Sequence, residues 1–148
     1  MPRILVSIDF SDLSRAALAW ALAYRAGEPH ELHLVHVVED SLVDVFSTRA
    51  SRDLSEEMAL LAREAEAELL KLAADSREGL VVHRHVLRGK PAARVVELAT
   101  ELGVELLVVG SAGRQGLERA LLGSVAERIV RTAPCSVVCV KAQGQALP

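Results

Sequence analysis

The segment that decides the fold is Val104-Glu105-Leu106-Leu107-Val108-Val109-Gly110-Ser111-Ala112-Gly113, which is followed by Gly123-Ser124. The apolar run over residues 104–109 is typical of a buried strand, and residues 125–132 are typical of a helix. Glycines in the turn between them leave backbone N–H groups open to a ligand, because no Cβ stands in the way. The helix that begins at Ser124 adds a positive dipole end and a hydroxyl donor. The segment therefore predicts an anion-binding turn.

The glycines of this segment have the spacing G-x2-G-x9-G-S. This spacing is neither the P-loop pattern, which needs G-x4-G-K-[ST], nor the dinucleotide fingerprint G-x-G-x-x-G. In an arbitrary sequence, Gly110, Gly113 and Gly123 would be ordinary turn glycines. The spacing taken alone leaves both interpretations open.

Strand-like and helix-like segments alternate along the chain, which favours a parallel sheet covered by helices on both faces. The predicted strands are residues 3–9, 32–38, 80–87, 105–109 and 136–141. Four helices are predicted. The first begins at a cap within 11–14 and ends at 26, and the second begins at a capping box at 53–56. The third runs from Pro91 to a stop at Gly103, and the fourth covers 124–132. We expect one three-layer α/β domain over residues 1–141 with a five-stranded parallel sheet, and a frayed tail over 142–148.

The composition bounds the class of protein. A chain of 148 residues suits a single domain. Hydrophobic residues make up 51% and aromatic residues only 3%, so the core must consist of Val, Leu, Ile and Ala, as in buried parallel strands. The net charge of −3, without a basic run or interleaved aromatic residues, argues against a nucleic-acid partner.

Neither a membrane partner nor a disulfide is expected. The apolar stretches fall short of the roughly 20 residues of a membrane span, and the start of the chain does not resemble a signal peptide, so we expect a cytoplasmic location. Cys135 and Cys139 lie four residues apart on one predicted strand, about 13 Å at roughly 3.3 Å per residue, which is too far for a disulfide. We expect both to be small buried hydrophobic residues without a catalytic role.

The chain resembles the universal stress protein family in five segments that follow the family's order. Besides the glycine-serine pattern, they are Ile4-Leu5-Val6-Ser7-Ile8-Asp9-Phe10-Ser11, Leu34-Val35-His36-Val37-Val38, Gly89-Lys90-Pro91 and Ala133-Pro134-Cys135-Ser136-Val137-Val138. The resemblance covers nearly the whole chain and implies a Rossmann-like, adenine nucleotide alpha hydrolase-like fold with strand order 3-2-1-4-5. The chain departs from the family at Ser136, where the family often has Pro, at the start of an edge strand and away from the nucleotide site.

The strand order that the resemblance implies brings Asp9 and Gly110 to one crevice. In such sheets, ligands bind at the carboxyl ends of the strands that flank the point where the chain reverses direction. Asp9 is either a cap for the following helix or a ligand to a ribose hydroxyl or a phosphate-bound metal, and the resemblance favours the second role. Val37 would contribute only its backbone N–H and C=O to the adenine edge.

The resemblance implies that the chain binds ATP, with AMP as a further candidate, and that Mg²⁺ is bound through the phosphates. Arg114 would then pair with phosphate oxygens, although an exposed, solvated Arg is the alternative. The implied nucleotide-binding residues are Asp9, Val37, Gly110, Gly113, Arg114, Gly123, Ser124 and Val125.

The implied function is a regulatory or protective role in the stress response, with at most slow ATP hydrolysis, because apart from Asp9 the sequence places no general base near the phosphates. One alternative is an ATP-using nucleotidyl transferase or hydrolase of the same layered fold, but the sequence lacks H-I-G-H, K-M-S-K-S and S-G-G-x-D-S motifs. Another is a nucleotide-free interaction protein that works as a dimer. The apolar edge strand over 136–141, with Val137, Val138 and Val140, predicts a homodimer in either case.

Four histidines invite a metal interpretation. His83 and His85 share one face of a predicted strand, and His33 and His36 lie on another strand. We see no carboxylate or Cys at matching spacing, and a structural zinc site requires a closed set of four ligands. We therefore expect no metal site, and we expect His36 to be a core or rim histidine.

Overall fold

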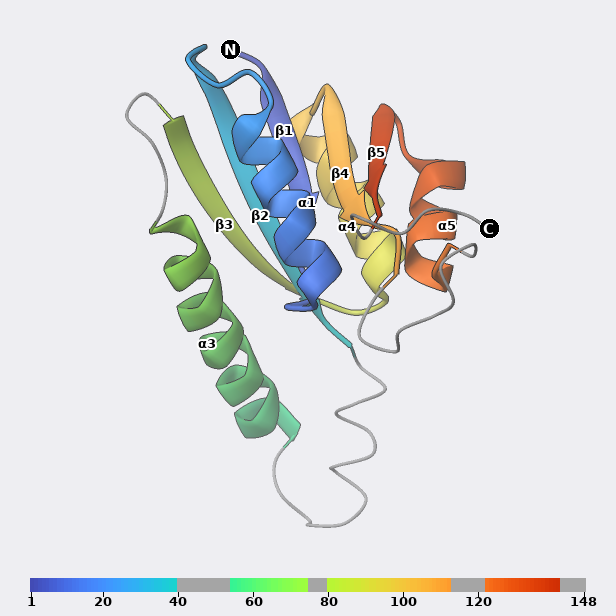
Figure 1. The fold of residues 1–148 in the computed structure, drawn as a ribbon. Coiled ribbons are helices and arrows are strands. Elements are labelled where there is room, and N and C mark those ends of the chain that lie inside the picture. The colour runs from blue at the N-terminus through green and yellow to red at the C-terminus, as the bar shows by residue number, and fades with distance from the viewer. Residues whose placement is uncertain (40–53, 75–79, 113–121, 142–148) are drawn as a thin grey trace.

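The structure is a computed structural model that describes residues 1–39, 54–74, 80–112 and 122–141. It contains a five-stranded parallel sheet in the order β3-β2-β1-β4-β5 (Figure 1). The strands are β1 (Arg3–Ser7), β2 (His30–Val38), β3 (Leu80–Arg88), β4 (Leu106–Gly110) and β5 (Ser136–Val140). The predicted strand order is confirmed.

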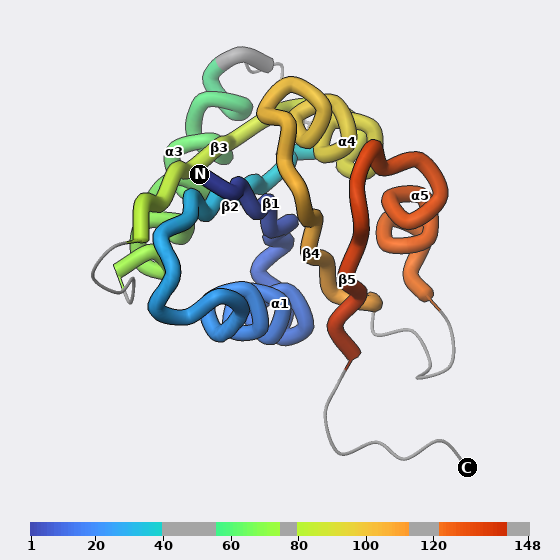
Figure 2. Tube along the Cα trace, turned by 90° about the horizontal axis from the view of Figure 1, so that it is seen from above, coloured from blue at the N-terminus to red at the C-terminus, as the bar shows by residue number. Residues whose placement is uncertain are grey.

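The helices form a layer on each face of the sheet. They are α1 (Asp12–Ala23), α3 (Leu54–Ala73), α4 (Pro91–Leu102) and α5 (Ser124–Thr132). Helix α1 lies on one face of the sheet, and α4 and α5 cover the opposite face (Figure 2). Helix α3 packs on the same face as α1, where its Leu69 is fully buried. The three-layer α/β architecture is therefore as predicted.

The sheet is buried on both faces because alternate side chains of a strand point in opposite directions. On β2, Leu32 and Leu34 join the core with α1 and α3, whereas Val35 and Val37 join the core with α4 and α5. The central strand β1 is apolar on both sides, and its Ile4, Leu5 and Val6 are fully buried. Such nearly continuous apolar strands are what a parallel sheet between two helical layers requires.

Helix α1 begins as predicted but ends earlier. Ser11 is its N-cap and its side chain accepts a hydrogen bond from the backbone N–H of Ser14. The helix ends at Ala23, not at residue 26, and Arg25 takes a left-handed conformation with φ 54°. The Arg25 side chain pairs with Glu28 and with Glu105 of the loop before β4. These contacts hold the chain in a turn, so the helix does not reach Gly27.

Other boundaries differ by one or two residues. Strand β1 ends at residue 7 and not 9, because the chain turns at Phe10 with a positive φ of 64°. Strand β2 begins two residues earlier than predicted, and β3 ends one residue later. Strand β4 begins and ends one residue later than predicted, and β5 ends one residue earlier. Helix α4 begins at Pro91 and ends at the left-handed Gly103, as predicted. The capping box at Asp53 and the tail over 142–148 fall outside the described residues.

Candidate functional site

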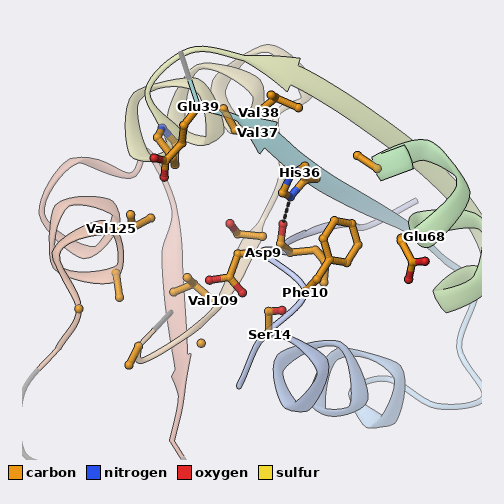
Figure 3. Close-up of a pocket in the computed structure, with 18 of the residues that line it drawn as sticks. Asp9, Phe10, Ser14, His36, Val37, Val38, Glu39, Glu68, Val109 and Val125 are labelled. Carbon is orange, nitrogen blue, oxygen red and sulfur yellow. Dashed lines mark hydrogen bonds between the residues drawn. The ribbon is translucent and has the colours of Figure 1, made fainter. Parts of the chain in front are cut away.

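A cleft of about 710 Å³ opens at the carboxyl ends of the strands (Figure 3). It lies where the chain changes direction across the sheet. Strand β1 pairs with β2 on one side and with β4 on the other, and it leads into α1 on one face. Strand β4 precedes α5, which covers the opposite face. Ligands of open α/β sheets bind at such a switch point.

The structure brings most of the predicted nucleotide-binding residues to this cleft. Its lining includes Asp9, Val37, Gly110, Gly123, Ser124 and Val125. These residues come from segments more than a hundred positions apart in the sequence, and they meet because β1 and β4 are neighbours. Gly113 and Arg114 fall outside the described residues.

Asp9 lies in the cleft and also supports the start of α1. Its Oδ1 accepts a hydrogen bond of 2.9 Å from the backbone N–H of Ser11 and a second one from the Ser11 hydroxyl. The Ser11 oxygen in turn accepts from the backbone N–H of Ser14 at 3.2 Å. Ser11, and not Asp9, is therefore the N-cap of α1, and Asp9 holds this capping residue while its half-buried carboxylate lies at the cleft wall (Figure 3).

Two aromatic rings form a wall of the cleft, a role that was not predicted from the sequence. The rings of Phe10 and His36 lie 4.7 Å apart between centroids, tilted by 36°. His36 Nδ1 lies 2.7 Å from the carbonyl oxygen of Ile8. Because a carbonyl oxygen only accepts, Nδ1 must carry the hydrogen. His36 is thus a half-buried rim histidine that is held in one orientation.

The left-handed backbone of Phe10 costs about 1–3 kcal/mol for a non-glycine residue. The conformation turns the chain sharply between β1 and α1, so that Asp9 and the Phe10 ring both line the cleft. The only signal for this role in the sequence is indirect, namely an aromatic residue immediately after a strand-ending carboxylate. Such strained residues concentrate at functional sites.

Helix α3 forms an acidic wall. Glu64 and Glu68 lie one turn apart on this helix and line the cleft together with Leu61 and Ala65. Their role could not be predicted from the sequence, because no local pattern places α3 relative to the ends of β1 and β4. Carboxylates on this side disfavour an anion there, so an anionic group of a ligand would be placed on the opposite side.

That opposite side consists of helix starts. Gly123 is the N-cap of α5 and supplies no side-chain cap, and Lys90 at the start of α4 makes no side-chain cap hydrogen bond either. The backbone N–H of Gly123 donates to Ser111 at 2.7 Å, which fixes the start of α5 against the end of β4. The first-turn N–H groups of a helix lack helical partners and carry its positive dipole end. This part of the cleft is therefore suited to an anion.

The cysteines are separate from this chemistry. Cys135 and Cys139 are free, half-buried, and packed against the core under α4 and α5. Burial raises the pKa of both thiols. Thiols in such surroundings are protonated at neutral pH and are poor nucleophiles.

A second cluster of titratable side chains lies on β2 and β3, outside the cleft. His33 Nδ1 lies 2.9 Å from His85 Nε2, and the His33 ring stacks on that of His83. Burial lowers the pKa of His33 and of His85, and the hydrogen bond from Arg3 lowers the pKa of Glu31. The expectation that no carboxylate accompanies these histidines was wrong, because Glu31 precedes His33 by two residues and its Oε2 lies 3.3 Å from His33 Nε2.

No helix within the described ranges has both the length and the apolar character needed to cross a membrane.

Comparison with known proteins gives a family. The model of the Universal stress protein family matches residues 1–141. Universal stress protein MJ0531 of Methanocaldococcus jannaschii is 36% identical over 140 residues, which span 94% of this chain and 81% of the relative. Universal stress protein YxiE of Bacillus subtilis is 31% identical over 145 residues, with 94% and 98% coverage.

Solved structures agree on the fold. The protein MJ0577, also a universal stress protein of Methanocaldococcus jannaschii, superposes with a TM-score of 0.84 at 26% identity and 97% coverage of both chains. A universal stress protein in complex with cAMP has a TM-score of 0.62 at 24% identity, with 95% and 96% coverage. One from Arabidopsis thaliana with AMP bound has a TM-score of 0.58 at 16% identity, with 97% and 94% coverage. With its family match over residues 1–141 and its Rossmann-like sheet, the chain belongs to the universal stress protein family.

Proposed function

We propose that the chain binds ATP in the cleft between the ends of β1 and β4, and that it acts in the cytoplasm as a regulatory or protective stress protein. The observation that carries this proposal is the meeting of Asp9, Gly110 and Ser124 around one cleft at a switch point of the sheet. Family members of the same fold have been solved with AMP and with cAMP. An adenine nucleotide is therefore the ligand class that fits both the fold and the cleft.

The charges around the cleft orient the nucleotide. The phosphates lie against the uncapped first turn of α5, where Ser124 supplies a hydroxyl and the helix supplies N–H groups. Glu64 and Glu68 exclude them from the α3 side. The base then lies toward the end of β2, where the backbone of Val37 and the ring of Phe10 border the cleft.

Mg²⁺ would enter with the phosphates. It prefers oxygen ligands and keeps several of its waters, so that it needs only one or two carboxylates from a protein. Asp9 supplies a carboxylate at the cleft wall, next to the start of α1. The Ser124 hydroxyl is a second oxygen on the side where we place the phosphates.

Binding, rather than turnover, is the function that these residues support. Among the described residues that line the cleft there is no Lys or Arg to stabilise charge that develops in phosphoryl transfer. Asp9 already accepts two hydrogen bonds from Ser11, and His36 uses Nδ1–H to hold the Ile8 carbonyl. We therefore expect at most slow hydrolysis.

A homodimer through β5 is part of the same proposal. Strand β5 forms the edge of the sheet and pairs only with β4 among the described strands. Its residues from Val137 to Val140 are apolar and half-buried. An apolar edge that pairs with the same edge of a second copy gives a closed, two-fold contact.

Calorimetric titration of the full chain with ATP and Mg²⁺ tests the nucleotide proposal, and we expect one site per chain. Ser124→Ala should weaken ATP about tenfold or more, because a hydrogen bond to a charged group contributes about 1.5–3 kcal/mol. The matched control is Thr100→Ala on α4, whose hydroxyl donates to Val96 O at 2.9 Å and does not line the cleft. Absence of heat and of a thermal shift with ATP, AMP and cAMP would leave the nucleotide-free interaction protein as the better account.

A further inference from the structure

The histidine cluster on β2 and β3 brings together side chains that are far apart in the sequence. In the parallel register, His33 lies opposite His83, and Val35 lies opposite His85. Glu31 and His33 share one face of β2, because side chains two residues apart point the same way. This is the face of Val35 and Leu87, which pack in the core with α4 and α5. His36, by contrast, lines the nucleotide cleft.

The spacing of the donor atoms matches that of metal ligands. One ligand atom from each of Glu31, His33 and His83 lies within 4.8 Å of the other two. The distance of 3.3 Å between His33 Nε2 and Glu31 Oε2 equals the edge of a tetrahedron whose corners are about 2.0–2.1 Å from a zinc ion. The His83 ring stacks on that of His33 with 13° between the planes, so it must turn out of this stack to point a nitrogen at the same ion. Its side chain is exposed, which leaves it room to turn.

We propose that Glu31, His33 and His83 form a binding site for a divalent transition-metal ion, with zinc as the best match. Imidazole nitrogens together with one carboxylate oxygen suit zinc better than calcium or magnesium, which prefer oxygen ligands alone. Three protein ligands leave a fourth position of the tetrahedron for water or another external ligand. Such an open set differs from the closed four-ligand site that the sequence argued against.

His85 acts as a positioning residue for His33. When His33 coordinates through Nε2, its Nδ1–H donates to His85 Nε2 across the observed 2.9 Å. A metal-bound histidine almost always makes such a second hydrogen bond, which fixes its tautomer and ring orientation. His33 is only 4% exposed, so its ring is already confined before any ion arrives.

Arg3 sets the strength of the site. Its Nε lies 2.9 Å from Glu31 Oε2, and its Nη1 donates to the Leu102 carbonyl at 2.9 Å, which holds the carboxylate beside His33. The guanidinium charge also opposes a cation at this distance. We therefore expect a weaker site than a closed structural zinc site.

The test is a titration of the full chain, stripped of metal by a chelator and free of nucleotide, with Zn²⁺. We expect one ion per chain and a rise in melting temperature, because an ion that binds only the folded state stabilises it. His83→Gln and Glu31→Gln should each lower the affinity for zinc by about tenfold or more. At known sites, even the loss of a residue that only hydrogen-bonds to a metal ligand has an effect of this size. His36→Gln removes a histidine from the same strand but outside the cluster and is the matched control, with unchanged zinc affinity.

The role of His85 has its own pair of variants. His85→Leu removes the acceptor for His33 Nδ1–H and should weaken zinc by about 10–100-fold. His85→Gln keeps an amide oxygen as acceptor and should recover most of that loss. Equal zinc affinity in the two variants would refute the positioning role, since a packing effect alone would not distinguish an amide from an alkyl group in this way.

Circular dichroism and melting in chelator establish that each variant is folded. If His33→Gln does not fold, the exposed His83 and the half-buried Glu31 decide the matter. The proposal is overturned if millimolar Zn²⁺ gives neither heat nor a thermal shift. It is equally overturned if His83→Gln and Glu31→Gln bind zinc as tightly as His36→Gln does.

Discussion

Gly110 at the end of β4 packs directly against Leu13 in the first turn of α1. A Cβ built at Gly110 would lie 2.9 Å from the Leu13 carbonyl carbon and 3.0 Å from both its carbonyl oxygen and its Cβ. The first contact is shorter than real Cβ atoms make, the other two are unusually tight, and two of the three involve backbone. Gly110 therefore allows α1 to approach β4, in addition to lining the cleft.

Gly110→Ala should lower the free energy of unfolding by about 1–3 kcal/mol, the usual cost of overpacking a core. Denaturant unfolding measures it. Adding Leu13→Ala should not restore stability, because alanine keeps the carbonyl group and the Cβ that the new methyl group meets. Full recovery in the double variant would show that the obstacle is the outer part of the Leu13 side chain.

Asp9→Asn should separate the two roles of Asp9. An amide oxygen still accepts the hydrogen bond from Ser11 N–H, so the melting temperature should change little, whereas the loss of the negative charge should weaken binding of ATP with Mg²⁺. Asp9→Ala should lower both, since it removes the acceptor as well. Calorimetry and melting of the two variants give the comparison. Unchanged ATP affinity in Asp9→Asn would leave Asp9 only its support of the capping residue Ser11.

The stability of the fold should fall in mild acid. Burial lowers the folded-state pKa of His33 and His85 below the ordinary 6.5, so the unfolded chain binds more protons just below that pH. Stability is then fully present above about pH 6.5 and declines as the pH falls toward the folded pKa values. The lowered pKa of Glu31 acts separately, through a loss that begins only near its ordinary value of 4.5.

Melting temperatures measured from pH 8 to pH 4 test this dependence. His85→Gln should make the curve flatter between pH 6.5 and 5, because it removes one of the two histidines and the charge that would face His33. Arg3, Glu31 and His83 remain as the other charged or titratable groups around His33. A curve identical to that of the parent would show that the loss of stability in acid comes from groups other than these histidines.

The proposed dimer contact can be tested by a substitution that affects only the side of β5 that faces away from β4. The Val140 carbonyl accepts from Ser111 N–H at 2.9 Å, so the polar backbone groups of Val140 point toward β4. Those of Cys139 point outward, because the backbone groups of successive strand residues alternate between the two sides. Cys139→Pro should therefore yield folded monomers, since proline removes only an outward N–H.

Val140→Pro should instead weaken the sheet itself and lower the melting temperature. Light scattering of both variants and of the parent distinguishes the two effects. A parent of 15.9 kDa in solution, or a dimer that survives Cys139→Pro, would contradict an interface along β5.

The sequence was sufficient for the architecture where local signals and tertiary packing agree. Pro91 and Gly103 bound α4 as predicted because their backbone preferences are intrinsic. The predicted end of α1 was wrong because Arg25 pairs with Glu105. The two residues are 80 positions apart in the sequence, so no local pattern contains this contact. The strand order came from the family resemblance and not from periodicity, which says nothing about which strands are neighbours.

The candidate site likewise contains residues that could be predicted from the sequence and residues that could not. Asp9 and Ser124 were predictable because each lies at an element end that the glycine pattern and the resemblance mark. The ring of His36 and the acidic wall of α3 were not, because their place at the cleft depends on how whole elements pack. The partnership of His33 with His83 depends on register between two strands, which the alternation of side chains leaves undetermined.

The central position of β1 has a consequence for synthesis on the ribosome. Ile4 pairs with Leu32 on one side and with Leu106 on the other. At translation rates of about 5–20 residues per second, the second partner emerges roughly 4–15 s after the first. Throughout that interval a strand whose three central residues are fully buried in the fold has one unpaired edge, which is a template for mispairing. A nascent chain that stalls before β4 is complete is therefore the form of this protein most in need of a chaperone.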